Sequence, residues 1–165
     1  MKRKFGLALL VFLAASGICF AQGFEIGASG FFASSDGASI SGGGLNIAGT
    51  SYFSDVIGWG TYGNILYASY ESVSIIVVDI LTGPVFNVIG DRTFALPIAV
   101  GLYVIEPFFF GDDAAGRGFN IGVGGNITAD ISFGGSTYLY IRLQVAYEFL
   151  GGGETMITPS IGLGF

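Results

Sequence analysis

The chain has 165 residues, a length that suits one domain, and 52% of them are hydrophobic whereas only 11% are charged. A soluble domain usually carries about 25% charged residues, so this composition is typical of a membrane protein. Twelve acidic side chains against six basic ones give a net charge of −6. Nucleic-acid binding depends on basic side chains that neutralise phosphates, so the composition argues against it.

The first 21 residues have the pattern of a secretory signal peptide. Three cations at 2–4 precede an apolar run at 5–13, and the small residue Ala21 precedes Gln22. We expect cleavage after Ala21, which divides the chain into a signal peptide, 1–21, and a mature domain, 22–165. One alternative is an uncleaved anchor, although the apolar run is shorter than the roughly 20 residues of a spanning helix. Another is lipidation at Cys19.

The mature domain is expected to be strongly acidic and to cross the membrane with strands. Only three arginines and no lysine follow residue 21, so its net charge is 3 − 12 = −9. Its longest apolar stretch, 94–105, is interrupted by Pro97 and Gly101, which leaves no helical span. Only helices and closed barrels satisfy the backbone in lipid. The 29 glycines and 16 phenylalanines also suit strands better than helices.

Alternation of apolar and polar residues predicts eight strands. In chain order they are expected at 23–32, 44–53, 56–67, 73–89, 93–106, 119–133, 137–149 and 155–165. The segment 137–149 is the clearest: its apolar face holds Leu139, Ile141, Leu143, Val145, Tyr147 and Phe149, and its other face is mostly polar. The strands 73–89 and 93–106 are apolar on both faces. Their lumen-facing side chains are expected to be Ile75, Val77, Leu81, Val85, Tyr103 and Ile105.

The predicted connections alternate between short and long. Tight turns are indicated at 54–55, 90–92 and 134–136, and longer connections near 33–43, 63–72, 107–118 and 150–154. Outer-membrane barrels pair short periplasmic turns with longer outer loops and have even strand numbers. The sequence therefore predicts an all-β fold, an eight-stranded antiparallel up-and-down transmembrane barrel with both ends on the periplasmic side. A soluble periplasmic β-sandwich or lipocalin-like binder would show the same local alternation and stays open.

At this point the chain resembles the small eight-stranded outer-membrane barrels of the OmpA, OmpX and OmpW type, across 22–165. The most specific element is the last strand, which carries Ile157, Ile161, Leu163 and the aromatic Phe165, with Pro159 where another apolar residue is commoner. The resemblance implies that the barrel-assembly machinery reads this strand, and that outer-membrane lipid surrounds the folded barrel. It implies the bacterial outer membrane as the location, and it names no surface partner.

Polar residues on the inward faces predict a lumen network. Its ionisable and amide members are Glu25, Asp79, Asp130, Arg142, Gln144 and Glu148. Since eight strands enclose just enough room for side chains, we interpret the network as structural. A buried arginine without a carboxylate is costly, so Arg142 is expected to pair with Glu25, Asp130 or Glu148.

The sequence offers little chemistry for catalysis. It has no histidine, which removes His-containing triads and His-ligated zinc, and no cofactor motif is present. Asp112 and Asp113 form a candidate loop site for a divalent cation, although a solvated acidic rim is the better interpretation. We therefore expect a non-enzymatic barrel with a structural or surface-interaction role. The alternative is a narrow channel or transporter for small hydrophobic molecules.

Overall fold

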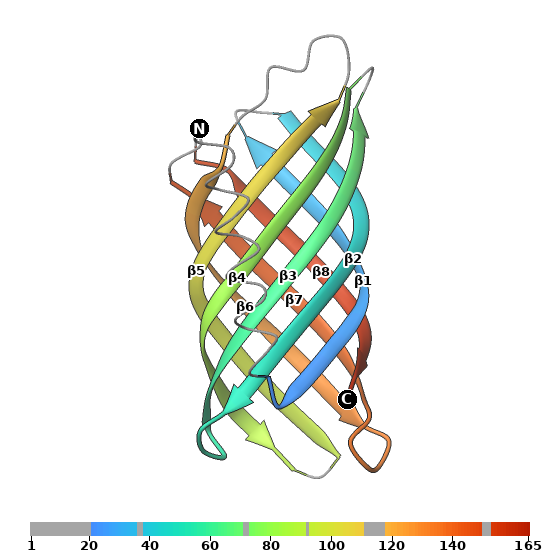
Figure 1. Cartoon of the computed structure of the whole chain (residues 1–165), viewed down its shortest axis with the longest axis vertical. Helices are drawn as coiled ribbons and strands as arrows, with labels where there is room; N and C mark the ends of the chain where they lie inside the picture. The colour runs from blue at the N-terminus through green and yellow to red at the C-terminus, as the bar shows by residue number, and fades with distance from the viewer. Residues whose placement is uncertain (1–20, 36–37, 71–72, 92, 111–117, 150–152) are drawn as a thin grey trace.

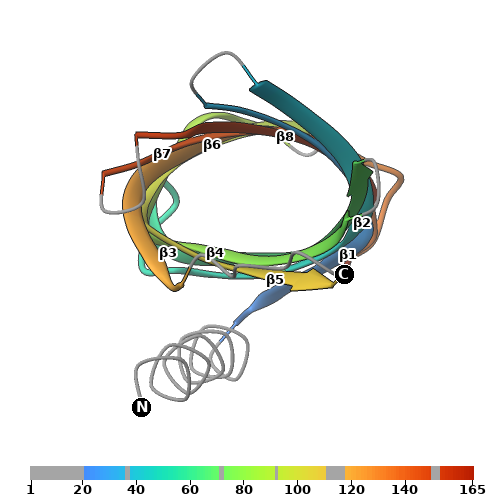
Figure 2. The same ribbon diagram turned by 90° about the horizontal axis from the view of Figure 1, so that it is seen from above.

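The computed structural model describes residues 21–35, 38–70, 73–91, 93–110, 118–149 and 153–165. It is a closed barrel of eight strands in chain order, each paired with the next and β1 with β8 (Figures 1 and 2). The strands are β1 (Gly23–Ser35), β2 (Ala38–Tyr52), β3 (Ile57–Tyr70), β4 (Val73–Gly90), β5 (Phe94–Phe110), β6 (Asn120–Ser132), β7 (Tyr138–Glu148) and β8 (Thr155–Gly164). No helix among the described residues is long and apolar enough to cross a membrane.

The seam between the first and last strands closes the barrel. All eight pairings are antiparallel, and β8 lies between β7 and β1. Phe24 and Phe165 exchange backbone hydrogen bonds of 3.1 and 2.8 Å, so the last residue of the chain lies against the first strand. The seam's register has a gap between the pairs Ser29–Ser160 and Phe32–Ile157, beside Pro159, which has no backbone N–H to donate. The predicted all-β up-and-down fold is confirmed.

Side chains alternate between the two faces of the wall as the sequence predicts. Along β7, even-numbered residues such as Tyr140 and Arg142 are buried inside, while Ile141 and Leu143 are exposed outside. Along β8, Met156 and Thr158 are buried and the outward face is apolar. The apolar side chains of these two strands, which would form the core of a soluble sandwich, thus point away from the barrel interior.

Exposed aromatic side chains gather toward both ends of the barrel's outer wall. One band lies near the end where β8 finishes and holds Phe53, Trp59, Phe94, Phe133 and Phe165. The other lies toward the opposite end and holds Phe32, Tyr67, Phe110, Tyr147 and Phe149. We call these the turn-end band and the far-end band. The outer wall between them is predominantly apolar.

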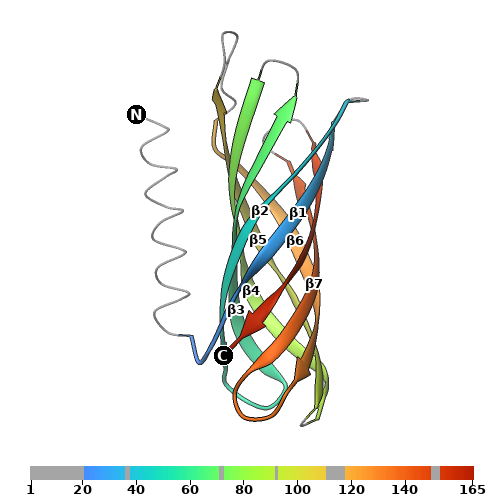
Figure 3. The same ribbon diagram turned by 90° about the vertical axis from the view of Figure 1, so that its right-hand side faces the viewer.

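Three short connections lie at one end, together with the C-terminus (Figure 3). They join β2 to β3, β4 to β5 and β6 to β7, as the sequence predicts, and we call this side the turn end. In the first, the Ser54 hydroxyl accepts the backbone N–H of Ile57 at 3.1 Å. In the third, Gly134 and Gly135 have φ values of 98° and 69°, a conformation that side chains with a Cβ rarely adopt.

The longer connections expected at 33–43 and 63–72 are wrong. β1 continues to Ser35, β2 begins at Ala38 and β3 continues to Tyr70, so these segments are mostly strand. β5 likewise continues to Phe110, which shortens the connection expected at 107–118. Glycine-rich composition led to the first error: a Cβ on Gly42 would lie 2.6 Å from Cε1 of Phe31, so glycine here makes room for an aromatic ring within the sheet.

The far end of the barrel is uneven. β4 has 18 residues whereas β8 has 10. The start of β2, residues 38–42, pairs with β1 but not with β3, whose pairing with β2 begins at Tyr67 opposite Gly43. Viewed along the barrel axis, this end of β2 lies outside the ring (Figure 2). β1 stays paired with β8 as far as Ser34, so only this start of β2, which we call the β2 arm, projects.

Candidate functional site: the barrel interior

Arg142 is the centre of the interior's polar side. β7 directs it inward, where only 4% of it is exposed, and its Nη2 donates to Glu25 Oε2 in an ion pair. Its Nε donates to the Thr128 hydroxyl at 3.0 Å. The guanidinium carbon lies 4.4 Å from the Tyr62 ring centre and 4.8 Å from that of Tyr140, within the range of cation–π attraction. The one cation found inside the described barrel is thus paired and enclosed.

A chain of neutral hydrogen bonds extends from this centre. Tyr140 donates its hydroxyl to Asn46 Oδ1, and Asn46 Nδ2 donates to Ser29 Oγ at 2.9 Å. Ser29 contacts Asn64 Oδ1 at 3.0 Å and Ser160 Oγ at 2.8 Å. Asn64 Nδ2 then donates to Asp79 Oδ1 at 2.8 Å. Side chains from β1, β2, β3, β4, β7 and β8 are therefore tied together across the lumen.

Space for the tyrosine of this chain comes from two glycines on the seam strands. A Cβ on Gly27 or Gly162 would lie 2.3 or 2.6 Å from the Tyr140 hydroxyl. These distances are far inside van der Waals contact, so a side chain at either position would displace the ring. These two glycines set where Tyr140 lies.

The six residues of the predicted lumen network all face inward, but they do not form one cluster. Glu25 and Arg142 form the ion pair, so the predicted pairing of Arg142 is present. Gln144 Nε2 lies 3.4 Å from Asp79 Oδ1, at the other end of the hydrogen-bonded chain. Glu148 Oε2 accepts from Asn120 at 2.9 Å, nearer the far end. Asp130 belongs to none of these three groups.

Sequence reasoning missed several members of this network. Tyr62 and Asn64 lie in the predicted strand 56–67, where glycines interrupt the alternation. Ser29 and Ser160 lie on inward faces, but a single serine does not by itself indicate a hydrogen-bond network. The period-two pattern does place all four inward once the register is known. The candidate loop residues Asp112 and Asp113, and Cys19 with residues 1–20 of the predicted signal peptide 1–21, lie outside the described residues. Among the described residues, no group of three or more His, Cys, Asp or Glu could hold a metal ion.

A cavity of about 430 Å³ opens at the turn end. Arg142 and Glu25 line it on the inside, and Asp130, Asp91 and the rings of Tyr52 and Tyr138 line its walls. The Tyr138 hydroxyl donates to Glu25 Oε1 at 3.2 Å. In the β4–β5 turn, Asp91 Oδ1 accepts from the Thr93 hydroxyl and from two backbone N–H groups, and these bonds lower the pKa of Asp91.

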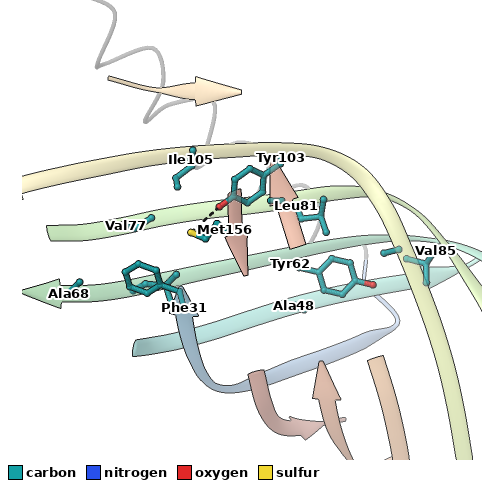
Figure 4. Packing of buried hydrophobic residues seen from close by; sticks show 13 residues of the cluster. Phe31, Ala48, Tyr62, Ala68, Val77, Leu81, Val85, Tyr103, Ile105 and Met156 are labelled. Carbon is teal, nitrogen blue, oxygen red and sulfur yellow. Dashed lines mark hydrogen bonds between the residues drawn. The ribbon is translucent and has the colours of Figure 1, made fainter. Parts of the chain in front are cut away.

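The remaining interior is apolar and lies on the side of β3, β4 and β5 and toward the far end. Figure 4 shows Phe31, Val77, Leu81, Tyr103 and Met156 packed together, with the Tyr103 hydroxyl donating to Met156 Sδ at 3.6 Å. The inward positions predicted for β4 and β5 belong to this cluster or pack against it. The members that are buried are at most 6% exposed, so the hydrocarbon lining predicted from sequence is a packed layer.

Comparisons with solved structures find proteins with the same architecture. Neisserial surface protein A aligns with a TM-score of 0.65 and 12% identity over 86% of this chain and 94% of that one. Ail, the attachment invasion locus protein of Yersinia pestis, in complex with the heparin analogue sucrose octasulfate, gives 0.63 and 12% over 86% and 95%. The N-terminal β-barrel domain of Pseudomonas aeruginosa OprF gives 0.50 and 16% over 88% and 98%.

At these identities the likeness establishes the fold, which is that of the small eight-stranded outer-membrane barrels. The resemblance that the last strand and the strand count suggested is thereby confirmed at the level of architecture. No protein-family model matches the chain, and no curated protein sequence matches it.

Proposed function

We propose that this chain is an integral outer-membrane barrel whose filled interior stabilises the fold and whose far end presents strands and loops at the cell surface. The observation that carries this proposal is the inversion of the barrel: its outer wall is apolar and its interior holds the polar network. A protein surrounded by water would expose the network and bury the hydrocarbon. No histidine is available for general-base chemistry, so we also propose no catalytic role.

The two aromatic bands support residence in a bilayer. Outer-membrane barrels have an apolar band about 25 Å tall between two aromatic girdles. Eight residue steps separate Ile157 from Phe165 on β8, and at about 3.4 Å per step and a tilt of about 40° they rise about 20 Å. The spacing between far-end and turn-end residues therefore suits a thin outer membrane. Outer-membrane barrels have their short turns on the periplasmic side, so we infer that the turn end faces the periplasm.

The interior supports a structural role over transport. The ion pair and its hydrogen bonds cross the lumen, and the apolar layer fills the space beyond them with side chains such as Leu66 and Tyr103 that are 0% exposed. The apolar layer is also what favours the second candidate function, a narrow path for small hydrophobic molecules. Such a path would require these side chains to move apart.

The projecting β2 arm supports interaction at the surface, because its outer edge offers backbone groups that β3 does not pair. What the arm contacts does not follow from Ail, whose crystals hold a heparin analogue. Binding to a polyanion requires basic side chains, whereas this sequence has three arginines and no lysine after residue 21, and Arg142 is buried. A sulfated polysaccharide is therefore not proposed for this chain.

Membrane residence is tested by expressing the full chain in a Gram-negative host and fractionating the cells. The protein should remain in the outer-membrane fraction after carbonate extraction, and it should migrate differently on a denaturing gel before and after boiling. Recovery of mature protein in the soluble periplasmic fraction would contradict the proposal and favour the soluble binder.

Transport is tested by flux into liposomes that hold the refolded barrel. The wild type should admit neither ions nor small apolar solutes faster than protein-free liposomes. A Phe31→Ala, Tyr103→Ala double variant, which thins the apolar layer, is the positive control and should leak. Flux of an apolar solute through the wild type would overturn the structural role in favour of the second candidate.

A further inference from the structure

Two hydrogen-bond acceptors in the lining of the turn-end cavity lack a donor. Asp130 Oδ1 and Asn87 Oδ1 are both buried without a hydrogen-bond partner. The two strongest donors of the lining point elsewhere: Arg142 donates to Glu25 and Thr128, and Tyr138 donates to Glu25. Buried acceptors without donors are costly, so the cavity is chemically complete only with a donor inside it.

The charge of the lining also favours a cation. Among its described residues, one guanidinium faces three carboxylates, those of Glu25, Asp130 and Asp91, which leaves 1 − 3 = −2. Arg142 forms an ion pair with Glu25, and its guanidinium lies over two tyrosine rings. Among the described residues, Asp130 forms no ion pair. An anion would meet this excess of negative charge, whereas a cation would pair with Asp130.

Aromatic rings make up much of the remaining wall. Tyr52, Tyr62 and Tyr138 line the cavity, and Phe94 and Phe165 of the turn-end band also border it. Organic ammonium groups are held in such surroundings by attraction to ring faces. A hydrated metal ion is less suited, since the described residues offer no group of three metal-binding side chains. The volume of about 430 Å³ lies within the range of about 300–1,000 Å³ typical of small-molecule sites.

We propose that the turn-end cavity binds an aliphatic amine through its ammonium group, with Asp130 as the ionic partner and Tyr52 and Tyr138 as aromatic walls. The ammonium supplies the donors that Asp130 Oδ1 and Asn87 Oδ1 lack. The aliphatic chain of the amine extends from Asp130 toward the open end of the cavity. This site does not depend on the surface role proposed above, because it rests on the opposite end of the barrel.

Isothermal titration of the refolded barrel in uncharged detergent micelles tests this site, with 1,5-diaminopentane as the probe. The wild type should bind the diamine, whereas 1,5-pentanediol, which has the same length and no charge, should give no heat of binding. Asp130→Asn should weaken binding by about tenfold or more, because it removes a buried charge-assisted hydrogen bond. Asp55→Asn is the matched control: it removes the same charge from another turn at the same end, does not line the cavity, and should leave the affinity within about twofold.

Tyr52→Leu provides a second test that leaves Asp130 in place. Loss of the ring should weaken binding several-fold, and Tyr52→Phe, which keeps the ring, should bind as the wild type does. Folding of each variant is checked by its shift on an unboiled gel. Equal weakening by Asp130→Asn and Asp55→Asn would overturn the proposal, since it would show attraction to the overall charge alone. Binding of the diol, or no binding of the diamine by the wild type, would overturn it as well.

Discussion

The two sides of the barrel interior are held together by different forces. On the polar side, an ion pair and directional hydrogen bonds join buried groups of β1, β2, β7 and β8 with Asn64 of β3 and Asp79 of β4, and each group depends on its partner. On the apolar side, most side chains come from β3, β4 and β5 and pack without directional partners. The polar side should therefore fail abruptly when one partner is lost, whereas the apolar side should weaken in proportion to the volume removed.

The largest effect is expected from Glu25→Gln, which leaves the buried Arg142 charge without its carboxylate. We expect the free energy of unfolding to fall by about 3–5 kcal/mol. The measurement is a urea titration in micelles followed by the fluorescence of Trp59, the one tryptophan of the chain. Replacing Arg142 as well, in a Glu25→Gln, Arg142→Gln double variant, should recover part of the loss. If the loss in the double variant equals the sum of the losses in Glu25→Gln and Arg142→Gln alone, the ion pair does not govern the stability of this side.

On the apolar side, Leu66→Ala should lower the free energy of unfolding by about 2–4 kcal/mol, because Leu66 is fully buried and its loss leaves a cavity. The matched control is Ile65→Ala, which removes a similar volume from the next residue of β3. Ile65 points outward and is 60% exposed, so its replacement should cost less than half as much. Equal losses would mean that the apolar layer is not packed. The same urea titration serves for both variants.

A smaller effect is expected where the seam strands approach Tyr140. Gly162→Ala should cost about 1–3 kcal/mol, since the added Cβ displaces the Tyr140 hydroxyl from Asn46 and crowds the backbone of β1. Gly63→Ala is the control, because a Cβ there meets no atom closer than 3.7 Å. Unfolding midpoints in urea should differ clearly between the two. An unchanged midpoint for Gly162→Ala would contradict the close approach.

The smallest effect is expected at the β4–β5 turn, which borders the turn-end cavity. Bonds from Thr93 hold the pKa of Asp91 below its ordinary value of 3.8 in the folded state. A lowered folded-state pKa contributes stability above the unfolded pKa, and that contribution is lost as the pH falls through the folded one. Wild type should therefore be slightly more stable than Asp91→Asn at pH 6, and the difference should vanish well below pH 3.8. A difference that persists at low pH would mean that charge is not its source.

The alternation along the strands was enough to predict the strand number, the inward and outward faces and the partner class of Arg142. In β7 most residues signal their own side, because the outward side chains are apolar or aromatic and the inward ones are mostly polar. β4 and β5 are apolar on both faces, and only the neighbouring strands decide that Leu81 and Tyr103 are inside. Strand ends near Gly42 were mispredicted, since glycine's local preference for turns was outweighed by contact with Phe31.

Other features of the interior required the register of the whole barrel. Ser29 meets Asn46, Asn64 and Ser160 only because β1 lies between β2 and β8, and no local pattern carries that information. The cavity at the turn end was also beyond sequence reasoning, since its lining comes from separate strands and turns. Sequence identified Asp130 as an inward carboxylate, but only the structure shows that Arg142 pairs with Glu25 instead of Asp130.

The seam between β1 and β8 also bears on the order in which the barrel forms. Hairpin contacts such as those of β7 with β8 join residues close in sequence, whereas Phe24 and Phe165 are separated by nearly the whole chain. Closing so long a loop is slow and is rewarded only when both strands are in place. Until then β1 and β8 each expose an edge that another chain can pair with. The barrel is therefore most vulnerable to aggregation just before its last pairing, and whatever holds β8 during folding protects the whole molecule.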